Sequence, residues 1–152
     1  MRAAGLLAST IILASGTPAS AAPAPPPLHQ GWIVTTADPT RCLTGGVIGT
    51  LIHSEPCDRG TAGQLWYQSS DGHLTGDGNC MQAGTAKRGA RVRVAACTWE
   101  ANQAWTFGTT LSNGDDGPCL TEEMVNSAGY GTIRLRPCNG TVAQNWKPIS
   151  LW

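Results

Sequence analysis

Short stretches in which apolar and polar residues alternate recur along this chain, and beyond the apolar N-terminal segment no stretch keeps a helical period. Residues 91–95 (RVRVA) and 132–136 (TIRLR) place aliphatic side chains on one face and arginine on the other. Such alternation is typical of a strand with one buried face. Tight turns are indicated by three dipeptides, Asp71-Gly72, Asp77-Gly78 and Asn113-Gly114. With 19 glycines and 10 prolines breaking the chain into short pieces, the pattern predicts an all-β protein.

A Gln-x-Trp triplet occurs three times, and its glutamines are 39 and 41 residues apart. The copies are Gln64 to Trp66, Gln103 to Trp105 and Gln144 to Trp146. A fixed period near forty residues indicates one supersecondary unit that is repeated. The repeats span about residues 31–69, 70–109 and 110–152.

Alignment of the repeats predicts four short strands in each. The first repeat has strands at 32–36, 42–44, 51–55 and 65–69. The second has strands at 73–76, 80–82, 91–96 and 105–109, and the third at 111–112, 119–122, 132–137 and 146–150. One such unit cannot bury its own apolar face, so the three must share a core.

The triplets have a structural interpretation. Trp66, Trp105 and Trp146 hold equivalent places and are expected to supply the largest side chains to the common core. A glutamine two residues earlier is expected on the same side of a strand, where its amide pairs with turn backbone that burial would leave unsatisfied. We therefore interpret these six residues as holding the fold rather than binding a ligand.

The six cysteines keep the same period as the triplets. In each repeat 14 to 18 residues separate two cysteines, and the second lies six or seven residues before the glutamine. Many pairings are possible in principle, but one gives each repeat its own bridge. The predicted disulfides are Cys42–Cys57, Cys80–Cys97 and Cys119–Cys138.

The N-terminal segment resembles a secretory signal. Met1-Arg2 is positive, residues 3–14 are apolar, and 19–21 (ASA) have the small-x-small form of a cleavage site. The apolar run is shorter than the roughly 20 residues that a membrane-spanning helix needs. We expect a signal peptide at residues 1–21, a Pro-rich disordered lead at 22–30, and one secreted, extracellular domain at 31–152. Export permits disulfides.

Ten basic and ten acidic residues balance over the full chain. A near-neutral chain is not expected to bind nucleic acid or an anionic membrane surface. His29, His53 and His73 show no metal-ligand spacing, and no serine-nucleophile motif occurs. No metal, no cofactor and no catalysis are therefore expected.

Three Gln-x-Trp triplets, one short-loop disulfide per repeat and a forty-residue period together resemble the ricin-B-type β-trefoil lectin family. The resemblance covers residues 32–152 and implies a β-trefoil of three pseudo-symmetric four-strand repeats. It also implies a non-catalytic carbohydrate-binding function, with one shallow sugar pocket per repeat on the outer face. Fold by itself does not establish that activity.

In that family a working pocket has an aspartate two residues after the first cysteine and an aromatic residue two before the second. It also has a polar residue four before the second cysteine and an asparagine before the Gln-x-Trp. This chain departs from the pattern in every repeat. The aspartate position holds Thr44, Gln82 and Thr121, and the aromatic position holds Glu55, Ala95 and Arg136. The polar position holds His53, Arg93 and Arg134, and the asparagine position holds Gly63, Asn102 and Ala143.

The resemblance and these departures predict a lectin-like domain with altered pockets. Asn102 is the one match to the asparagine position, and Trp99 offers a new stacking face nearby, so a rebuilt pocket is conceivable from Gln82, Arg93, Trp99 and Asn102. Substitute acceptors are Asp77, Asp115 and Asp116. The alternative is that Trp99 folds onto its turn and the aspartates cap turns.

Arginine residues suggest a second possibility, an anion-binding patch for acidic or sulfated glycans. Arg93, Arg134 and Arg136 share the outward face, with Lys87, Arg88 and Arg91 near the second repeat. The alternative is a solvated charged face. The whole domain also has an alternative function, as a degenerate trefoil that binds a protein partner and no sugar.

Overall fold

The computed structural model describes residues 29–85 and 89–151. Within them lie twelve strands and three short 3₁₀ helices. The first repeat contains β1 (His29–Thr35), β2 (Arg41–Thr44), β3 (His53–Pro56), η1 (Ala62–Gln64) and β4 (Trp66–Gln68). The second contains β5 (Leu74–Gly76), β6 (Asn79–Ala83), β7 (Val92–Ala95), η2 (Ala101–Gln103) and β8 (Trp105–Phe107). The third contains β9 (Leu111–Asn113), β10 (Cys119–Val125), β11 (Gly131–Arg136), η3 (Val142–Gln144) and β12 (Trp146–Ser150).

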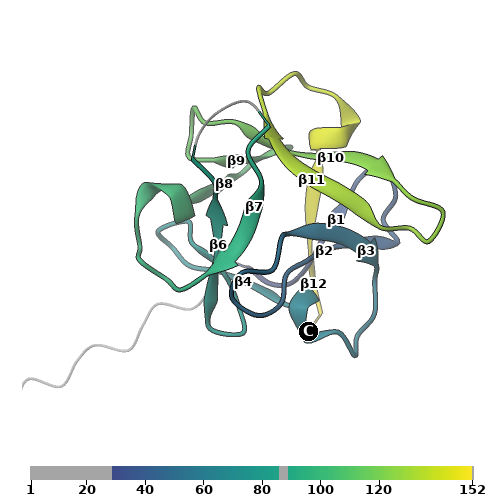
Figure 1. Cartoon of the computed structure of the whole chain (residues 1–152), viewed down its shortest axis with the longest axis horizontal. Helices are drawn as coiled ribbons and strands as arrows, with labels where there is room; N and C mark the ends of the chain where they lie inside the picture. Colours follow the sequence, from purple (N-terminus) through teal and green to yellow (C-terminus); the bar gives the residue numbers. More distant parts are fainter. Residues whose placement is uncertain (1–28, 86–88, 152) are drawn as a thin grey trace, which may run out of the picture.

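Six strands form a closed ring and six form hairpins (Figure 1). In the ring, β1 pairs with both β4 and β12, β4 with β5, and β8 with β9. Single bridges, His73 to Ala104 and Thr110 to Asn145, close it between β5 and β8 and between β9 and β12. The hairpins are β2–β3, β6–β7 and β10–β11. The predicted all-β fold with three four-strand repeats is confirmed.

The three hairpins join one another at their edges. β3 pairs with β11 through Ser54 and His53. The N–H of Ile52 donates to the carbonyl of Val92 at 2.9 Å, which joins the first hairpin to the second. The second and third hairpins are joined by the N–H of Leu135, which donates to the carbonyl of Ala90 at 2.9 Å. Residues of all three repeats therefore lie side by side where the hairpins meet.

Two strand boundaries differ from the predicted ones by three residues, and the others agree to within two. β1 begins at His29, within the predicted lead, because His29 and Gln30 pair with β4. β10 continues to Val125, since its pairing with β11 runs on past a bulge between Glu123 and Val125. The longer β10–β11 hairpin extends at the right of Figure 1. The predicted signal peptide, most of the lead, and Lys87 and Arg88 lie outside the described residues.

The three tryptophans of the triplets lie in the core and are almost fully buried. Each indole N–H donates to the carbonyl of the residue that follows the first cysteine of its repeat. The pairs are Trp66 to Leu43 at 2.8 Å, Trp105 to Met81 at 2.8 Å and Trp146 to Leu120 at 2.9 Å. A buried tryptophan needs such a partner for its polar edge. The repetition of this bond fixes each indole in the same orientation.

The three glutamines lie in 3₁₀ turns rather than in strands, so the predicted placement on a strand face is wrong. The turn places the side-chain amide beside the second cysteine, where its oxygen and its nitrogen both find backbone partners. The side-chain oxygens accept from the N–H groups of Asp58, Thr98 and Asn139. The side-chain amides donate to the carbonyls of Pro56, Ala96 and Pro137. Each glutamine thus clamps the backbone on both sides of its repeat's second cysteine.

The disulfides are Cys42–Cys57, Cys80–Cys97 and Cys119–Cys138, one within each repeat, as predicted. The two Cα atoms of each bridge are 5.0 Å apart. Closing a loop of this size stabilises the fold by roughly 3 kcal/mol, through the chain entropy that the unfolded state loses.

One core position departs from the threefold pattern. Ser54 is buried where Val94 and Leu135 lie in the other repeats. Its hydroxyl donates to Glu122, which also accepts from the Arg41 guanidinium at 3.1 and 2.6 Å. The hydrogen bond with Glu122 is the main cause that raises the pKa of Arg41. This network of Ser54, Glu122 and Arg41 joins the first repeat to the third.

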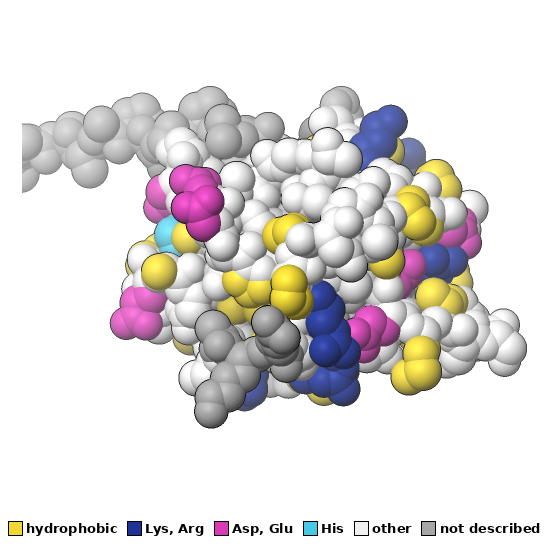
Figure 2. Space-filling view, turned by 90° about the horizontal axis from the view of Figure 1, so that it is seen from above, with side chains coloured by type: hydrophobic (Ala, Val, Ile, Leu, Met, Phe, Trp, Pro, Cys, Tyr) yellow, Lys and Arg dark blue, Asp and Glu magenta, His cyan; other side chains and the backbone are white. Residues whose placement is uncertain are grey.

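Charges are mixed over the surface. Figure 2 shows basic and acidic side chains interspersed on the face it presents, with apolar side chains scattered between them. No helix in residues 29–85 and 89–151 is long and apolar enough to span a membrane. Within the same residues, no three histidine, cysteine or acidic side chains gather as ligands of a metal ion would.

Candidate functional site

The aspartate positions of the three expected pockets turn inward. The hydroxyls of Thr44 and Thr121 are buried and donate to the carbonyls of Cys42 and Cys119 at 3.1 and 3.0 Å. The side-chain oxygen of Gln82 accepts from the amide of Gln103 at 2.8 Å. These side chains therefore pair with the protein itself.

In the third repeat, the residues at the polar and aromatic positions, Arg134 and Arg136, pair with a carboxylate. Glu123 accepts from Arg136 at 2.6 Å and lies 3.3 Å from Arg134. Arg134 also donates to the carbonyl of Gly89 at 2.9 Å. Two of the three arginines of the predicted anion patch are therefore paired with a carboxylate. Arg93 is exposed on β7.

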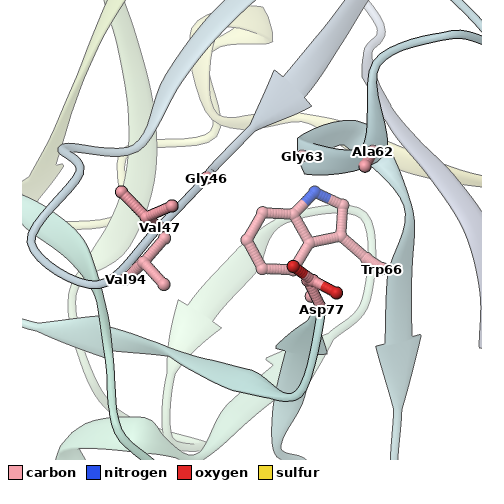
Figure 3. A pocket seen from close by; sticks show the side chains of 8 residues that line it. Gly46, Val47, Ala62, Gly63, Trp66, Asp77 and Val94 are labelled. Carbon is pink, nitrogen blue, oxygen red and sulfur yellow. The ribbon is translucent and has the colours of Figure 1, made fainter.

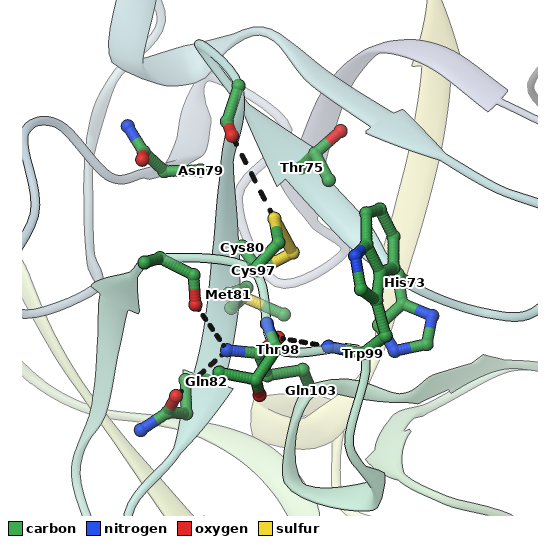
Figure 4. The surroundings of a disulfide bond; sticks show 12 residues. His73, Thr75, Asn79, Cys80, Met81, Gln82, Cys97, Thr98, Trp99 and Gln103 are labelled. Carbon is green, nitrogen blue, oxygen red and sulfur yellow. Dashed lines mark hydrogen bonds between the residues drawn. A yellow bond between two sulfur atoms is a disulfide. The ribbon is translucent and has the colours of Figure 1, made fainter.

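The four residues of the predicted rebuilt pocket do not share one site. Gln82 and Arg93 lie opposite each other on β6 and β7. Trp99 lies on the other side of Gln103 (Figure 4), with its ring edge against His73 at a centroid distance of 4.9 Å. Asn102 lies in η2, and its side-chain oxygen is buried without a hydrogen-bond partner in the described part of the chain. The structure brings Gln82 and Arg93 together and turns Trp99 away.

Trp99 has an unusual backbone. Its φ is +60°, a left-handed conformation that a bulky side chain rarely adopts. Gly140 holds the equivalent position in the third repeat with a φ of +72°. Trp99 is nevertheless 59% exposed. The turns of the second and third repeats share this backbone, and the tryptophan fits it less well than glycine does.

Beneath Trp99, Asp71 connects two side chains of its turn. The Ser69 hydroxyl donates to the Asp71 carboxylate, and the Nδ1 of buried His73 lies 3.0 Å from the same carboxylate. The Ser69 bond and then His73 lower the pKa of Asp71 to about 2. No nucleophile is activated here, because Ser69 bonds to the carboxylate rather than to an imidazole nitrogen.

Asp71 gives the fold a measurable dependence on acid. Its pKa is lower in the folded state, so its contribution to stability is present above about pH 4 and is lost as the pH falls through about 2. Asp71→Asn should therefore lower the melting temperature at neutral pH, and the difference from wild type should shrink towards pH 2. Calorimetry across this range measures it. A difference that stays constant with pH would contradict the assignment.

Asp115 and Asp77, two of the expected substitute acceptors, have different surroundings. Asp115 accepts from the hydroxyl of Thr106 at 2.8 Å, as a turn-capping residue does. Asp77 lies at a small apolar pocket of about 180 Å³, where its carboxylate faces the indole of Trp66, with Val47 and Val94 opposite (Figure 3). Ligand pockets usually hold at least about 300 Å³, so this pocket lies below the usual range.

A larger cavity lies where the three hairpins meet. We call it the hairpin hollow. It measures about 510 Å³ and opens widely to solvent. Its lining residues come from all three repeats: His53, Arg91, Met124, Val125, Asn126, Tyr130, Gly131 and Thr132. Tyr130 and His53 stack there, with ring centroids 6.1 Å apart and an angle of 18° between the rings.

The β10–β11 turn positions Tyr130. The side-chain oxygen of Asn126 accepts from the N–H groups of Ala128 and Tyr130 at 2.9 and 3.0 Å. A β-carbon on Gly131 would lie 2.2 Å from the Ser54 hydroxyl, so glycine is needed for the hairpin to approach β3. Tyr130 remains 46% exposed with one ring face beside His53. The hollow thus contains an aromatic surface, whereas none of the three repeats has an aromatic residue at the position expected in a sugar pocket.

Polar groups border this aromatic surface. His53 Nδ1 lies 3.0 Å from the carbonyl of Leu51, and Nε2 lies 3.6 Å from the Glu55 carboxylate. Gln64 donates to the same carboxylate at 3.3 Å. Arg91 lines the hollow, and its buried Nε has no hydrogen-bond partner among the described residues. The arrangement offers an aromatic plate, one guanidinium and the Thr132 hydroxyl to a ligand.

Sequence reasoning missed the hairpin hollow because it compared equivalent positions within repeats. Tyr130 matches no position of the expected pocket, and Arg91 and His53 belong to other repeats. One signal was available. The cysteines of the third repeat are 19 residues apart, against 15 and 17 in the others, which indicates a longer hairpin.

A family model described as "Ricin-type beta-trefoil lectin domain" matches residues 29–146. No curated protein sequence matches the chain.

Solved structures share the fold at low sequence identity. A non-toxic homologue of type II RIPs from Momordica charantia (bitter gourd), in complex with α-methyl-D-galactoside, is 16% identical with a TM-score of 0.70, over 83% of this chain and 49% of that one. GalNAc-T7, solved with UDP, GalNAc and Mn²⁺, is 19% identical with a TM-score of 0.69, over 84% of this chain and 23% of that one. The designed threefold-symmetric protein ThreeFoil is 18% identical with a TM-score of 0.69, over 80% of this chain and 99% of that one. Against GalNAc-T7 and the hemolytic lectin CEL-III, the chain spans only 23% and 31% of the other protein's length.

Proposed function

Because this chain belongs to the ricin-type β-trefoil lectin domain family, we propose that it binds carbohydrate through the hairpin hollow and catalyses no reaction. The aspartate positions of the three ordinary pockets turn inward and pair with the protein itself. In the hollow, an aromatic face and polar groups border one cavity.

The single observation that carries the proposal is the half-exposed Tyr130 ring in a cavity of sugar-accommodating size. Pockets for small ligands usually measure roughly 300 to 1,000 Å³, and the hollow measures about 510 Å³. An aromatic face covers the apolar C–H face of a sugar ring, while nearby polar groups take its hydroxyls. The bitter gourd homologue, which shares this fold, is in complex with a galactoside.

Binding without catalysis is supported by the lining of the hollow. Glycoside hydrolysis needs two carboxyl groups flanking the bond that breaks. The eight residues that line the hollow include no aspartate or glutamate. We further propose that the protein is secreted, on the basis of the signal-like residues 1–21 and three disulfides, which persist in oxidising compartments.

Tyr130→Ala should abolish or strongly weaken sugar binding, because it removes the stacking surface. Aromatic stacking contributes about 0.5–1.5 kcal/mol beyond area burial, so we expect a loss of roughly tenfold or more once burial is included. A glycan array on the mature protein would identify a ligand, and calorimetric titration would measure its dissociation constant. Tyr130→Phe keeps the ring and should bind nearly as well as wild type.

Trp99→Ala is the matched control, since it removes another exposed aromatic residue outside the hollow. Binding that survives Trp99→Ala and is lost in Tyr130→Ala places the sugar in the hollow. Loss in Trp99→Ala with no change in Tyr130→Ala would contradict the proposal and favour the site predicted around Asn102.

A second function, docking of a protein partner, has one observation in its favour. Met124, Val125 and Tyr130 are 82%, 42% and 46% exposed around the tip of the β10–β11 hairpin. A blank glycan array together with a specific partner that Met124→Ser releases would favour this scaffold function over sugar binding.

A further inference from the structure

We infer that the ligand of the hairpin hollow is an anionic sugar, whose carboxylate or sulfate pairs with Arg91. The inference rests on the proposed carbohydrate-binding function and adds the chemical class of the sugar. It depends on the charge of the residues that line the hollow and on the partners that the nearby carboxylates already have.

Arg91 is a cation that pairs with no carboxylate in the described part of the chain. It directly precedes β7, and its backbone carbonyl accepts from the N–H of Gly84 at 2.9 Å. Its side-chain Nε is buried and has no hydrogen-bond partner in residues 29–85 and 89–151. A guanidinium stays charged at every relevant pH, and a buried donor without a partner is costly. Arg91 also lines the hollow, so its guanidinium can meet a ligand oxygen there.

Three arginines around the hairpins differ from Arg91 in this respect. Arg41 pairs with Glu122, and both Arg134 and Arg136 pair with Glu123. No ion pair to Arg91 is found within the described residues. An arginine that lines a cavity without an acidic partner presents its charge to whatever enters.

The carboxylates on the surrounding strands are engaged elsewhere. On β3, Glu55 lies 3.6 Å from His53 and accepts from Gln64. On β10, Glu122 and Glu123 pair with arginines. The lining itself contains one guanidinium, that of Arg91, and no acidic side chain. The hollow therefore favours an anionic ligand over a cationic one. The neighbouring carboxylates already pair with other residues.

The shape of the hollow fits a charged sugar ring. Tyr130 and Arg91 both line one cavity, so a ring stacked on Tyr130 can direct an acidic substituent at the guanidinium. A guanidinium binds carboxylate or sulfate oxygens through charge-assisted hydrogen bonds, which are stronger than bonds to a neutral hydroxyl. The Thr132 hydroxyl lines the same cavity and suits a ring hydroxyl. Charge thus gives selectivity, while the aromatic ring gives general affinity for sugars.

The test compares oligosaccharides matched in length but different in charge. Oligogalacturonides, sulfated galactan oligosaccharides and neutral galactan oligosaccharides are titrated into the mature protein by calorimetry. We expect an anionic ligand to bind roughly tenfold to a hundredfold more tightly than the neutral one, the range for one charge-assisted hydrogen bond. The comparison of carboxylated with sulfated ligands identifies which anion is preferred.

Arg91→Gln should remove this preference, so that charged and neutral ligands bind about equally, while Tyr130→Ala should weaken all three ligands. Arg93→Gln is the control, because it makes the same charge change two residues along, on an exposed side chain that does not line the hollow. Arg93→Gln should keep the preference. Circular dichroism verifies that each variant is folded.

The outcomes separate the two proposals. Equal binding of charged and neutral ligands, lost in Tyr130→Ala, overturns the anionic preference and keeps the carbohydrate function. A preference that survives Arg91→Gln also overturns the inference, since the selectivity then arises elsewhere. No binding of any ligand in these titrations and on the array overturns the carbohydrate function and the inference with it.

Discussion

Replacing Glu122 with alanine should lower the free energy of unfolding by about 3–5 kcal/mol, the usual cost of leaving one partner of a buried ion pair alone. The Glu122 side chain is only 5% exposed and accepts from both Arg41 and Ser54. Alanine leaves the Arg41 guanidinium, itself mostly buried, facing an apolar cavity with Asp38 as its remaining anion. The Ser54 hydroxyl also loses its acceptor. Urea unfolding followed by far-ultraviolet circular dichroism, with the disulfides intact, measures the change.

A triple variant tests whether the loss comes from unpaired polar groups rather than from lost volume. Arg41→Met, Ser54→Val and Glu122→Leu together replace the network with apolar side chains, and valine occupies the Ser54 position in the second repeat as Val94. Well-packed apolar replacements of buried ion pairs are often neutral, so this variant should recover most of the stability lost in Glu122→Ala. Glu100→Ala, on an exposed turn, is the charge control and should change stability by less than about 0.5 kcal/mol. A Glu122→Ala protein as stable as wild type would show that the network contributes little.

Replacing Trp105 with alanine should cost about 3–5 kcal/mol, the range for a fully buried aromatic residue. Trp105 is 1% exposed in the core shared by the three repeats. Its removal opens a cavity and also leaves the carbonyl of Met81 without its indole donor. Both effects act in the same direction. The same unfolding experiment measures the loss, and circular dichroism is used because the substitution changes the fluorescence.

Trp99→Gly provides the contrast within the same repeat. Trp99 is exposed and adopts a left-handed backbone that glycine adopts without strain. Its loss should leave stability within about 1 kcal/mol of wild type, or raise it slightly, since relief of strain offsets the contact with His73. If Trp99→Gly were as damaging as Trp105→Ala, the two tryptophans would not have the separate roles assigned to them.

The repeat and its internal bonds were predictable because they depend on short separations along the chain. Each disulfide and each pair of Gln-x-Trp residues lies within one forty-residue unit, and the alternation of strands such as 91–95 is local. The turn position of the glutamines was not predicted, because the period-two alternation is a property of strands and gives no information about the turn that precedes one. Trp99 was assigned to a pocket on sequence proximity to Asn102, but its left-handed backbone directs it towards His73.

The amino-acid sequence by itself therefore determined the β-trefoil, its three bridges and its tryptophan core, because each depends on a local pattern that occurs three times along the chain. Only the tertiary structure decided which residues meet across repeats. His53, Arg91 and Tyr130 lie in three different repeats, and they share one cavity because the closed ring forces the hairpins together at their edges. The Arg41–Glu122 pair is likewise separated by 81 residues. Such contacts follow from ring closure, which no periodicity along the chain encodes.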